Sequence, residues 1–124
     1  MKVKTSELAG VALDWAVAKA SGALSPLGNV VLKGNIRLII AVGLIEEPTV
    51  LYEPSTDWSQ GGPIIEREGI CLKKGHSGWW IAKLLDVNDE EHFVTVAPTP
   101  LIAAMRCYVM SKLGDTVDIP EEVR

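Results

Sequence analysis

The amino-acid sequence predicts an α+β fold: a mainly antiparallel sheet of about five or six short strands, with an N-terminal and a C-terminal helix. Residues 5–20 and 99–113 carry helix signals, and the segments between them are short and rich in β-branched residues. Connections between these segments are too short for the helical crossovers of parallel strands, which favours antiparallel pairing. With 124 residues, the chain is expected to form one domain over residues 1–124.

The first predicted helix is marked at both ends. Thr5 or Ser6 is expected to cap it, Glu7 lies favourably in its first turn, and Gly22 is expected to stop it. Apolar residues at helical spacing form one stripe that we interpret as core rather than as a cofactor site: Leu8, Val11, Ala12, Trp15 and Ala18.

The middle of the chain is predicted to be extended. Residues 30–32 and 36–45 are expected to form a hairpin around Gly34-Asn35, which ends at Glu46-Glu47-Pro48. Further extended segments are expected at residues 49–53, 62–74 (broken at Gly69), 79–86 and 93–97, with a turn at 75–78 and a charged loop at 87–92.

The last predicted helix has the clearest signals. Thr99 is expected to cap it, Pro100 fits its first turn, and Gly114 is expected to end it. The tail, residues 115–124, is acidic and is expected to be extended.

Charge and cysteine content exclude several classes of function. The net charge is −4 and no run of Lys and Arg suits a phosphate backbone, so nucleic acid is not an expected partner. A local pocket for a small phosphorylated ligand remains open. Cys71 and Cys107 have no metal-like spacing, and one disulfide between them is left open.

The hydropathy of the sequence leads to two expectations, one about the location of the protein and one about its association. The apolar run from Leu38 to Ile45 is too short to cross a bilayer, and the polar start resembles no signal peptide. We therefore expect a cytoplasmic protein that does not bind membranes. The mean hydropathy of +0.20 is high for so small a domain, which favours a homo-oligomer.

No catalytic motif is recognised, and no cofactor or metal is expected. His76 and His92 lie in polar turns, the Asp89-Glu90 pair is typical of a solvated loop, and Cys107 is expected to be a buried thiol.

The segment "YEPSTDWSQGGPIIERE", residues 52–68, is the first candidate binding site. Its polar residues favour tight turns, its glycines would allow positive φ and close approach to a ligand, and its aromatic rings could stack on a base. The candidate residues are Tyr52, Ser55, Thr56, Asp57, Trp58, Gly61, Gly62 and Pro63. The alternative is a rigid structural turn with Trp58 in the core.

The start of the last helix is the second candidate site. Free N–H groups at a helix N-terminus bind anions, Thr99 offers a hydroxyl, and Arg106 lies about two turns along. The alternative is ordinary capping by Thr99, with Arg106 in an ion pair.

Three blocks carry a family resemblance: "MKVKTSELAGVALDWAVAKA", "YEPSTDWSQGGPIIEREGI" and "PTPLIAAMRCYVMSKLGDTVDIPEE". Together they cover about 60 of the 124 residues and resemble the NinX-like family of small proteins from the nin region of tailed phages and prophages. The resemblance implies a phage origin rather than a particular activity. It also implies importance for the family-defining positions, which are Ser55, Thr56, Asp57, Trp58, Gly61, Gly62, Pro63, Thr99, Pro100, Leu101 and Arg106.

Three hypotheses for function follow. By analogy with small phage proteins that sequester host immune signals, the first is a non-enzymatic binder of a nucleotide-derived molecule, such as a cyclic dinucleotide or cyclic ADP-ribose derivative. Trp58 would contact its base or ribose and Arg106 its phosphate. The second is a module that binds a host or phage protein through Trp79 or Trp80. The third is a small nucleotide-processing enzyme, which needs a histidine or carboxylate beside residues 52–63.

Overall fold

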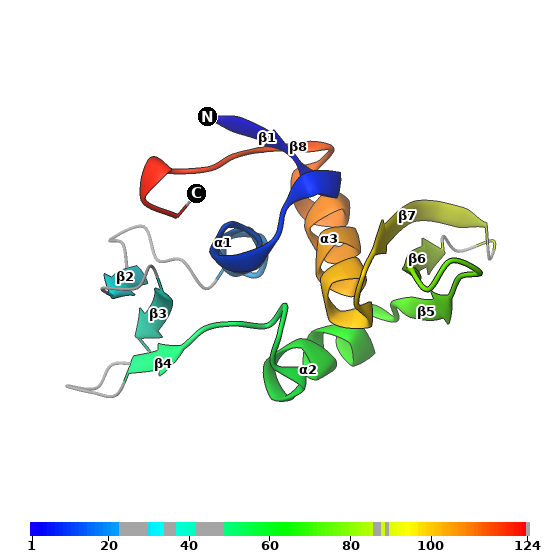
Figure 1. Ribbon diagram of the computed structural model, residues 1–124, viewed down its shortest axis with the longest axis horizontal. Coiled ribbons are helices and arrows are strands. Elements are labelled where there is room, and N and C mark those ends of the chain that lie inside the picture. The colour runs from blue at the N-terminus through cyan, green and yellow to red at the C-terminus, as the bar shows by residue number, and fades with distance from the viewer. Residues whose placement is uncertain (23–29, 34–36, 42–48, 86–87, 89, 124) are drawn as a thin grey trace.

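The structure is a computed structural model of the chain. It describes residues 1–22, 30–33, 37–41, 49–85, 88 and 90–123. Within these residues lie three α-helices: α1 (Gly10–Ala20), α2 (Trp58–Glu68) and α3 (Pro100–Leu113), shown in Figure 1. Two short 3₁₀ turns, Thr5–Glu7 and Glu121–Val123, precede α1 and end the described chain.

The described strands form three antiparallel sheets, which confirms the α+β class but divides the expected single sheet. The first pairs β1 (Lys2–Lys4) with β8 (Thr116–Asp118). The second has the order β2 (Val30–Lys33), β3 (Arg37–Ala41), β4 (Thr49–Leu51), and the third β5 (Cys71–Lys74), β6 (Trp80–Leu85), β7 (Glu91–Ala97).

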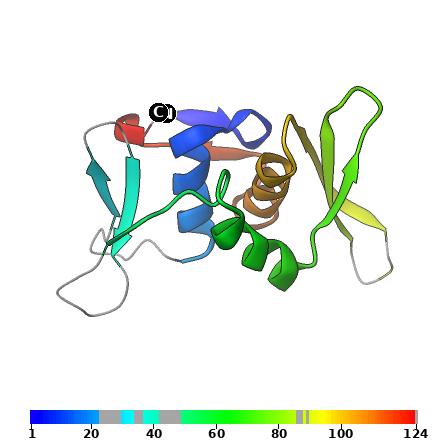
Figure 2. The same ribbon diagram turned by 60° about the horizontal axis from the view of Figure 1, so that its bottom comes forward.

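The helices lie between the sheets. Figures 1 and 2 show β2–β3–β4 at one end of the molecule and β5–β6–β7 at the other, with α1 and α3 side by side between them. The β1–β8 ribbon crosses one side of the helices and α2 the other. This layering explains why several short sheets, rather than one, are stable: each covers a different side of the same helical core.

Helix α3 is the centre of the core. Seven of its residues are buried, including Met105, Tyr108 and Val109, so it is apolar around most of its circumference. Small residues on the neighbouring sheet, Ala82 and Ala97, are fully buried and let the helix approach closely. As predicted, the helix begins after Thr99, whose hydroxyl accepts the Ile102 N–H at 3.2 Å, and stops at Gly114 with φ +92°.

Helix α1 begins later than the sequence predicts. Ala9 precedes it without a side-chain cap, because Thr5 is buried and its hydroxyl donates to the Gly114 carbonyl at 2.6 Å. The expected apolar stripe is only partly correct: Leu8 and Ala18 are buried, but Val11, Ala12 and Trp15 are half-buried while Leu13, Ala16 and Val17 are buried. The helix packs on more than one side. Gly22, with φ +75°, follows its end as predicted.

Helix α2 corrects the prediction of loop and strand for residues 58–68. Asp57 caps it, accepting the Ser59 N–H at 2.9 Å and the Ser59 hydroxyl at 2.7 Å. Gly69 ends it in the left-handed conformation, with φ +71°. The helix forms despite Pro63 in its interior, because it lies against α3 in the folded protein.

The other predicted strands agree with the structure. Strands β2 and β3 form the expected hairpin, with Val31 opposite Ile39, while Gly34-Asn35 and residues 46–48 lie outside the described residues. The tail forms β8 and a 3₁₀ turn, and the Met1 ammonium contacts Asp118 Oδ1 at 2.8 Å beside it.

Candidate functional site

A pocket of about 240 Å³ lies where α2 and α3 begin. Its lining comes from both candidate segments: Ser55, Thr56, Trp58, Thr99, Pro100, Leu101 and Ile102. The two segments are separated by about 40 residues in the sequence. The fold therefore joins part of each predicted site into one cavity.

Hydrogen bonds hold the loop before α2 in a compact turn. The N–H groups of Thr56 and Asp57 both donate to the Glu53 carbonyl, at 3.1 and 2.9 Å. The Glu53 N–H donates to Gln60 Oε1 at 2.7 Å, which ties the turn to the helix that follows. The Asp and Thr residues thus form the local turns that their side chains predict.

The close approach expected of the glycines occurs within the protein rather than toward a ligand. A Cβ atom on Gly61 would lie 2.4 Å from the Pro54 carbonyl oxygen and 2.6 Å from a methyl carbon of Leu101. Gly61 therefore allows α2 to pack against the turn and the start of α3. Apart from its chain neighbours and the backbone of its own helix, a Cβ on Gly62 would meet no atom within 4 Å, and Pro63 is exposed. Neither glycine adopts the positive φ that a residue without a side chain allows.

Two helix N-termini face this region. Pro100 has no N–H, Thr99 accepts the Ile102 N–H, and the Ala103 N–H donates to the Thr99 carbonyl, which leaves the Leu101 N–H for another acceptor. Helix dipoles favour negative charge at both starts, although the Asp57 carboxylate already occupies that of α2. The pocket can thus receive an acceptor atom at α3.

Trp58 is 54% exposed at the edge of the pocket. The alternative in which this ring fills the core is therefore wrong. Its exposed indole provides a flat apolar surface beside the polar groups of the turn.

Ser55 lines the pocket and is 1% exposed, yet its hydroxyl oxygen makes no hydrogen bond among the described residues. Its N–H donates to Asp14 Oδ1 at 2.9 Å. Burial raises the pKa of Asp14 to about 6, while the Ser55 hydroxyl and N–H partly offset that rise. The Ser55 side chain is thus close enough to the Asp14 carboxyl to lower its pKa, and its hydroxyl oxygen is buried.

Two predicted site residues lie elsewhere. Arg106 donates from Nε to the Leu8 carbonyl at 2.7 Å and from Nη1 to the Val96 carbonyl at 2.9 Å. Burial lowers the pKa of its guanidinium. Its predicted phosphate role does not fit this geometry, because the group already joins two backbone segments. Tyr52 packs against the core, and burial raises its pKa.

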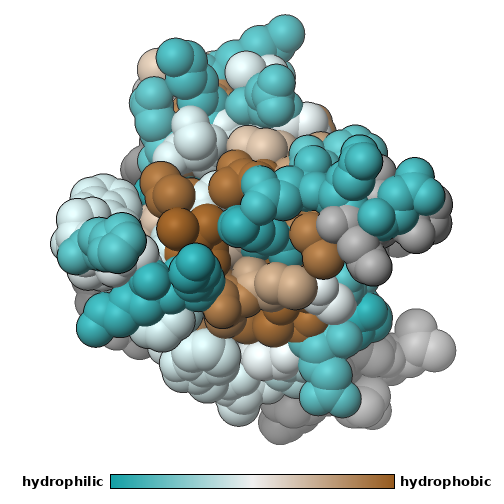
Figure 3. Space-filling view, turned by 90° about the vertical axis from the view of Figure 1, so that its right-hand side faces the viewer, coloured by the Kyte–Doolittle hydropathy of each residue, from teal (hydrophilic) through white to brown (hydrophobic). Residues whose placement is uncertain are grey.

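A second, shallow depression of about 520 Å³ lies at one end of the third sheet, lined by Gly75, His76, Ser77, Trp79, Ile81 and Val96. Figure 3 shows an apolar region on this side of the molecule, bordered by hydrophilic residues. The sequence pointed to Trp79 but not to Ile81 or Val96. The register of β6 and β7, which places those two side by side, was the missing information.

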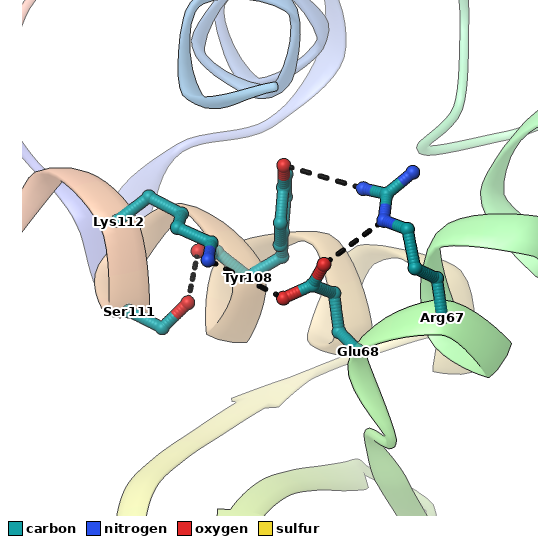
Figure 4. A network of polar contacts seen from close by, with 5 residues as sticks. All are labelled: Arg67, Glu68, Tyr108, Ser111 and Lys112. Carbon is teal, nitrogen blue, oxygen red and sulfur yellow. Dashed lines mark hydrogen bonds and ion pairs between the residues drawn. The ribbon is translucent and has the colours of Figure 1, made fainter. Parts of the chain in front are cut away.

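A polar network joins the end of α2 to α3 (Figure 4). Arg67 donates to Glu68 at 2.9 Å and to the Tyr108 hydroxyl at 3.4 Å, and Lys112 lies 3.5 Å from Glu68. The hydrogen bond from Arg67 lowers the pKa of Glu68. The sequence indicated none of these contacts. Their arrangement fastens two helices together and leaves both Glu68 oxygens engaged.

The cysteines and histidines form no joint site in the described residues. Cys71 is exposed and Cys107 is buried, both as free thiols, so the disulfide left open does not form. Burial raises the pKa of Cys107 to about 11. The His92 ring stacks on the Phe93 ring, with 4.4 Å between the ring centroids, and His76 borders the shallow depression. No three His, Cys, Asp or Glu residues of the described chain are grouped to hold a metal.

The described chain is a small α+β protein whose central helices are flanked by three antiparallel sheets, with a pocket where α2 and α3 begin. Residues 4–112 match the family described as Bacteriophage P22, NinX, and because this is most of the chain, the protein belongs to that family. The match confirms the resemblance carried by the three sequence blocks, and the chain is a phage accessory protein. No curated protein matches it. None of the described helices has the length and apolarity needed to cross a bilayer.

Proposed function

We propose that this phage protein binds a small nucleotide-like ligand, without chemical turnover, in the pocket between residues 55–58 and 99–102. One observation carries the proposal: an exposed indole, the polar turn before α2 and the N-terminus of α3 line the same cavity. A nucleotide combines a flat ring with phosphate oxygens, which are the groups that such a set of side chains and N–H groups recognises.

In this proposal the base stacks on Trp58, and an oxygen of the ligand accepts the Leu101 N–H. The pocket volume of about 240 Å³ lies below the range of about 300–1,000 Å³ typical of complete ligand sites. It therefore suits one base or one phosphorylated sugar, so a cyclic dinucleotide or cyclic ADP-ribose derivative would enter with one half.

Recognition of phosphate would depend on N–H and hydroxyl groups, because Arg106 is engaged elsewhere. A neutral donor set loses less affinity with added salt than a cluster of Lys and Arg does. Weak salt dependence is therefore expected of the binding, which distinguishes this pocket from one built on cations.

Calorimetry with a panel of cyclic dinucleotides, ADP-ribose derivatives and mononucleotides tests the proposal. Trp58→Ala is expected to weaken binding of any positive ligand by about 5- to 150-fold, since base stacking contributes about 1–3 kcal/mol. Trp79→Ala is the matched control, because Trp79 is similarly exposed but lines the other depression. No binding by any nucleotide, or an equal loss in both variants, would contradict the proposal.

A second function, docking of another protein, is favoured by a separate observation: Trp79, Ile81 and Val96 line an apolar depression outside the pocket. Loss of a protein partner on Trp79→Ala, with nucleotide binding unchanged, is its expected signature.

A further inference from the structure

Asp14 is a buried acid on α1. Among the described residues it is the only Asp, Glu, Lys, Arg or His that is buried, with 5% of its surface exposed. Buried carboxylates are normally paired with a cation, but no described cation forms an ion pair with Asp14. Lys19, the only basic residue of the same helix, lies over the Trp15 ring instead. The charge of Asp14 is therefore costly to form in the folded protein.

The contact that Asp14 makes leads to the pocket. Its Oδ1 atom accepts the Ser55 N–H at 2.9 Å, although 41 residues separate the two in the sequence. Ser55 and the adjacent Pro54 are fully buried in the turn before α2. Ser55 and Thr56 of this turn line the pocket, and Trp58 at its edge follows directly. A movement of the turn therefore changes the surroundings of Asp14 and the shape of the pocket together.

The closed turn favours the protonated form of Asp14. Burial raises the pKa of the carboxyl from 3.8 to about 6, the two interactions with Ser55 lower it, and the nearby charge of Glu53 raises it. Burial is the largest of these effects, so it outweighs the hydrogen bond that ionisation would strengthen. A turn that opens returns the carboxyl to water and to its ordinary pKa. The closed turn is thus most stable below about pH 4 and loses stability as pH rises to about 6.

The other ionisable groups around Asp14 do not reverse this sign. Among the side chains that the structure describes, Glu53 is the only charge that shifts the Asp14 pKa, and it shifts it upward. Tyr52, from the same segment, has a pKa that burial raises from its ordinary value of 10.0, so it is neutral in this pH range. Tyr52 in turn interacts with Tyr108 of α3 and with Arg67 of α2. Asp14 is therefore the buried group beside the turn that changes charge.

An anionic ligand acts in the same direction as the turn. Negative charge placed in the pocket disfavours a second negative charge on Asp14 and raises its pKa further. A ligand that holds the turn closed also keeps the carboxyl away from water. Linkage is reciprocal, so a ligand that favours protonation of Asp14 binds more tightly once Asp14 is protonated.

We propose that Asp14 controls the affinity of the pocket for anionic nucleotide ligands, which bind tightly when its carboxyl is protonated and more weakly when it is ionised. The inference deepens the function proposed above and, for its ligand, rests on that function. Asp14 does not line the pocket. It is a positioning residue that acts through the turn at Ser55, so that proton and ligand bind cooperatively.

The pH dependence of binding tests the proposal. Calorimetry between about pH 5 and about pH 8 uses cyclic mononucleotides and cyclic dinucleotides, because their phosphodiesters lack the second proton that a phosphate monoester loses near pH 6. Wild-type affinity is expected to fall about three- to tenfold over this range, since a pKa change of one unit corresponds to a factor of ten. Asp14→Asn keeps an oxygen acceptor for the Ser55 N–H without charge. Its affinity should be independent of pH and, near the upper limit, higher than that of wild type.

Asp118→Asn is the matched control. It removes an exposed carboxyl on the β1–β8 ribbon and should retain the wild-type pH profile of binding. Circular dichroism at each pH verifies that all three proteins are folded. A wild-type affinity that does not change with pH, or a decline that Asp14→Asn shares, would overturn the proposal.

A second measurement needs no ligand. The indole N–H signal of Trp58, assigned by its loss in Trp58→Phe, is followed by NMR spectroscopy of the free, isotopically labelled protein. It should shift with the ionisation of Asp14 in wild type and stay constant in Asp14→Asn. The signal of Trp79, at the other depression, is the internal control and should behave alike in both proteins.

The two measurements separate this inference from the function on which it rests. If no nucleotide binds but the Trp58 signal follows Asp14, the proposed function fails while the control of the pocket by Asp14 stands. If a nucleotide binds and the Trp58 signal is indifferent to Asp14→Asn, the proposed function stands and the role of Asp14 is refuted.

Discussion

Asp14 is a buried carboxyl whose ionisation opposes folding. Its oxygen accepts the Ser55 N–H beneath the pocket, and burial raises its pKa from 3.8 to about 6. The folded state therefore holds a proton that the unfolded chain has already lost between about pH 4 and pH 6. The stability contributed by this group is complete below about pH 4 and is lost as pH rises to about 6.

Asp14→Asn is expected to remove this dependence, because an amide oxygen still accepts the Ser55 N–H without carrying charge. Relative to wild type, the variant should be more stable at pH 7 than at pH 4: the difference in free energy of unfolding, variant minus wild type, should rise by at most about 3 kcal/mol. Urea unfolding at several pH values measures this. Asp118→Asn is the control. Because the Met1 ammonium lowers the pKa of Asp118, the stability of this variant relative to wild type should fall as pH rises, opposite to the trend for Asp14→Asn. Parallel pH profiles for wild type and Asp14→Asn would contradict the assignment.

Gly61 and Gly62 are adjacent glycines with different expected effects. Gly61→Ala places a methyl group 2.4 Å from the Pro54 carbonyl oxygen, so the turn or the helix must shift, at a cost of about 1–3 kcal/mol. Gly62→Ala meets no atom of another element, and its gain in helix propensity of about 0.5–1 kcal/mol is opposed by the Pro63 ring, so it should destabilise the protein much less than Gly61→Ala does. Chemical denaturation of both variants compares them, and equal effects would refute the close approach described for Gly61.

At the scale of the element, α2 and α3 show what local sequence could and could not predict. The signals at Thr99, Pro100 and Gly114 are local, so the bounds of α3 were predictable. In α2 the residues Gly61 to Pro63 disfavour a helix locally, and only packing against the turn and α3 explains it. Segment 52–63 was therefore identified as unusual while its conformation was predicted wrongly.

The same limit applies to the candidate site. Turn chemistry at residues 53–57 follows from side-chain types, and so did the selection of Ser55, Thr56 and Trp58. Whether the two segments meet depends on how α2 lies against α3, which no local pattern contains. The orientation of the Arg106 side chain likewise depends on the tertiary fold, because the guanidinium donates to the carbonyls of Leu8 and Val96, which are distant in the sequence or belong to another element.

Arg106 joins the segment before α1 to β7. Arg106→Ala leaves the Leu8 and Val96 carbonyls without this donor and is expected to cost about 1–3 kcal/mol of stability. Any nucleotide bound by the wild type should bind the variant within about twofold at a temperature where both are folded, since the guanidinium does not line the pocket. Thermal unfolding and calorimetry measure the two effects. A large loss of affinity with unchanged stability would restore a phosphate role for this residue.

At the scale of the whole molecule, α3 relates the two proposed surfaces. Its first turn lines the pocket, and its body packs against the sheet β5–β6–β7. A ligand at the first turn and a protein partner at the depression beside Trp79 would therefore contact different parts of the fold around α3. Because the residues that line each surface differ, the effects of their substitutions should add rather than couple.

The two thiols differ in exposure, so their reactivity reports the folded state. Cys71 is exposed on β5, whereas Cys107 is fully buried in α3, where burial raises its pKa to about 11. A disulfide reagent should modify Cys71 rapidly and Cys107 only as the chain opens, because the thiolate is the reactive form. Cys71→Ser should remove the fast phase alone. Equal modification rates for the two thiols in the native protein would contradict the burial of Cys107.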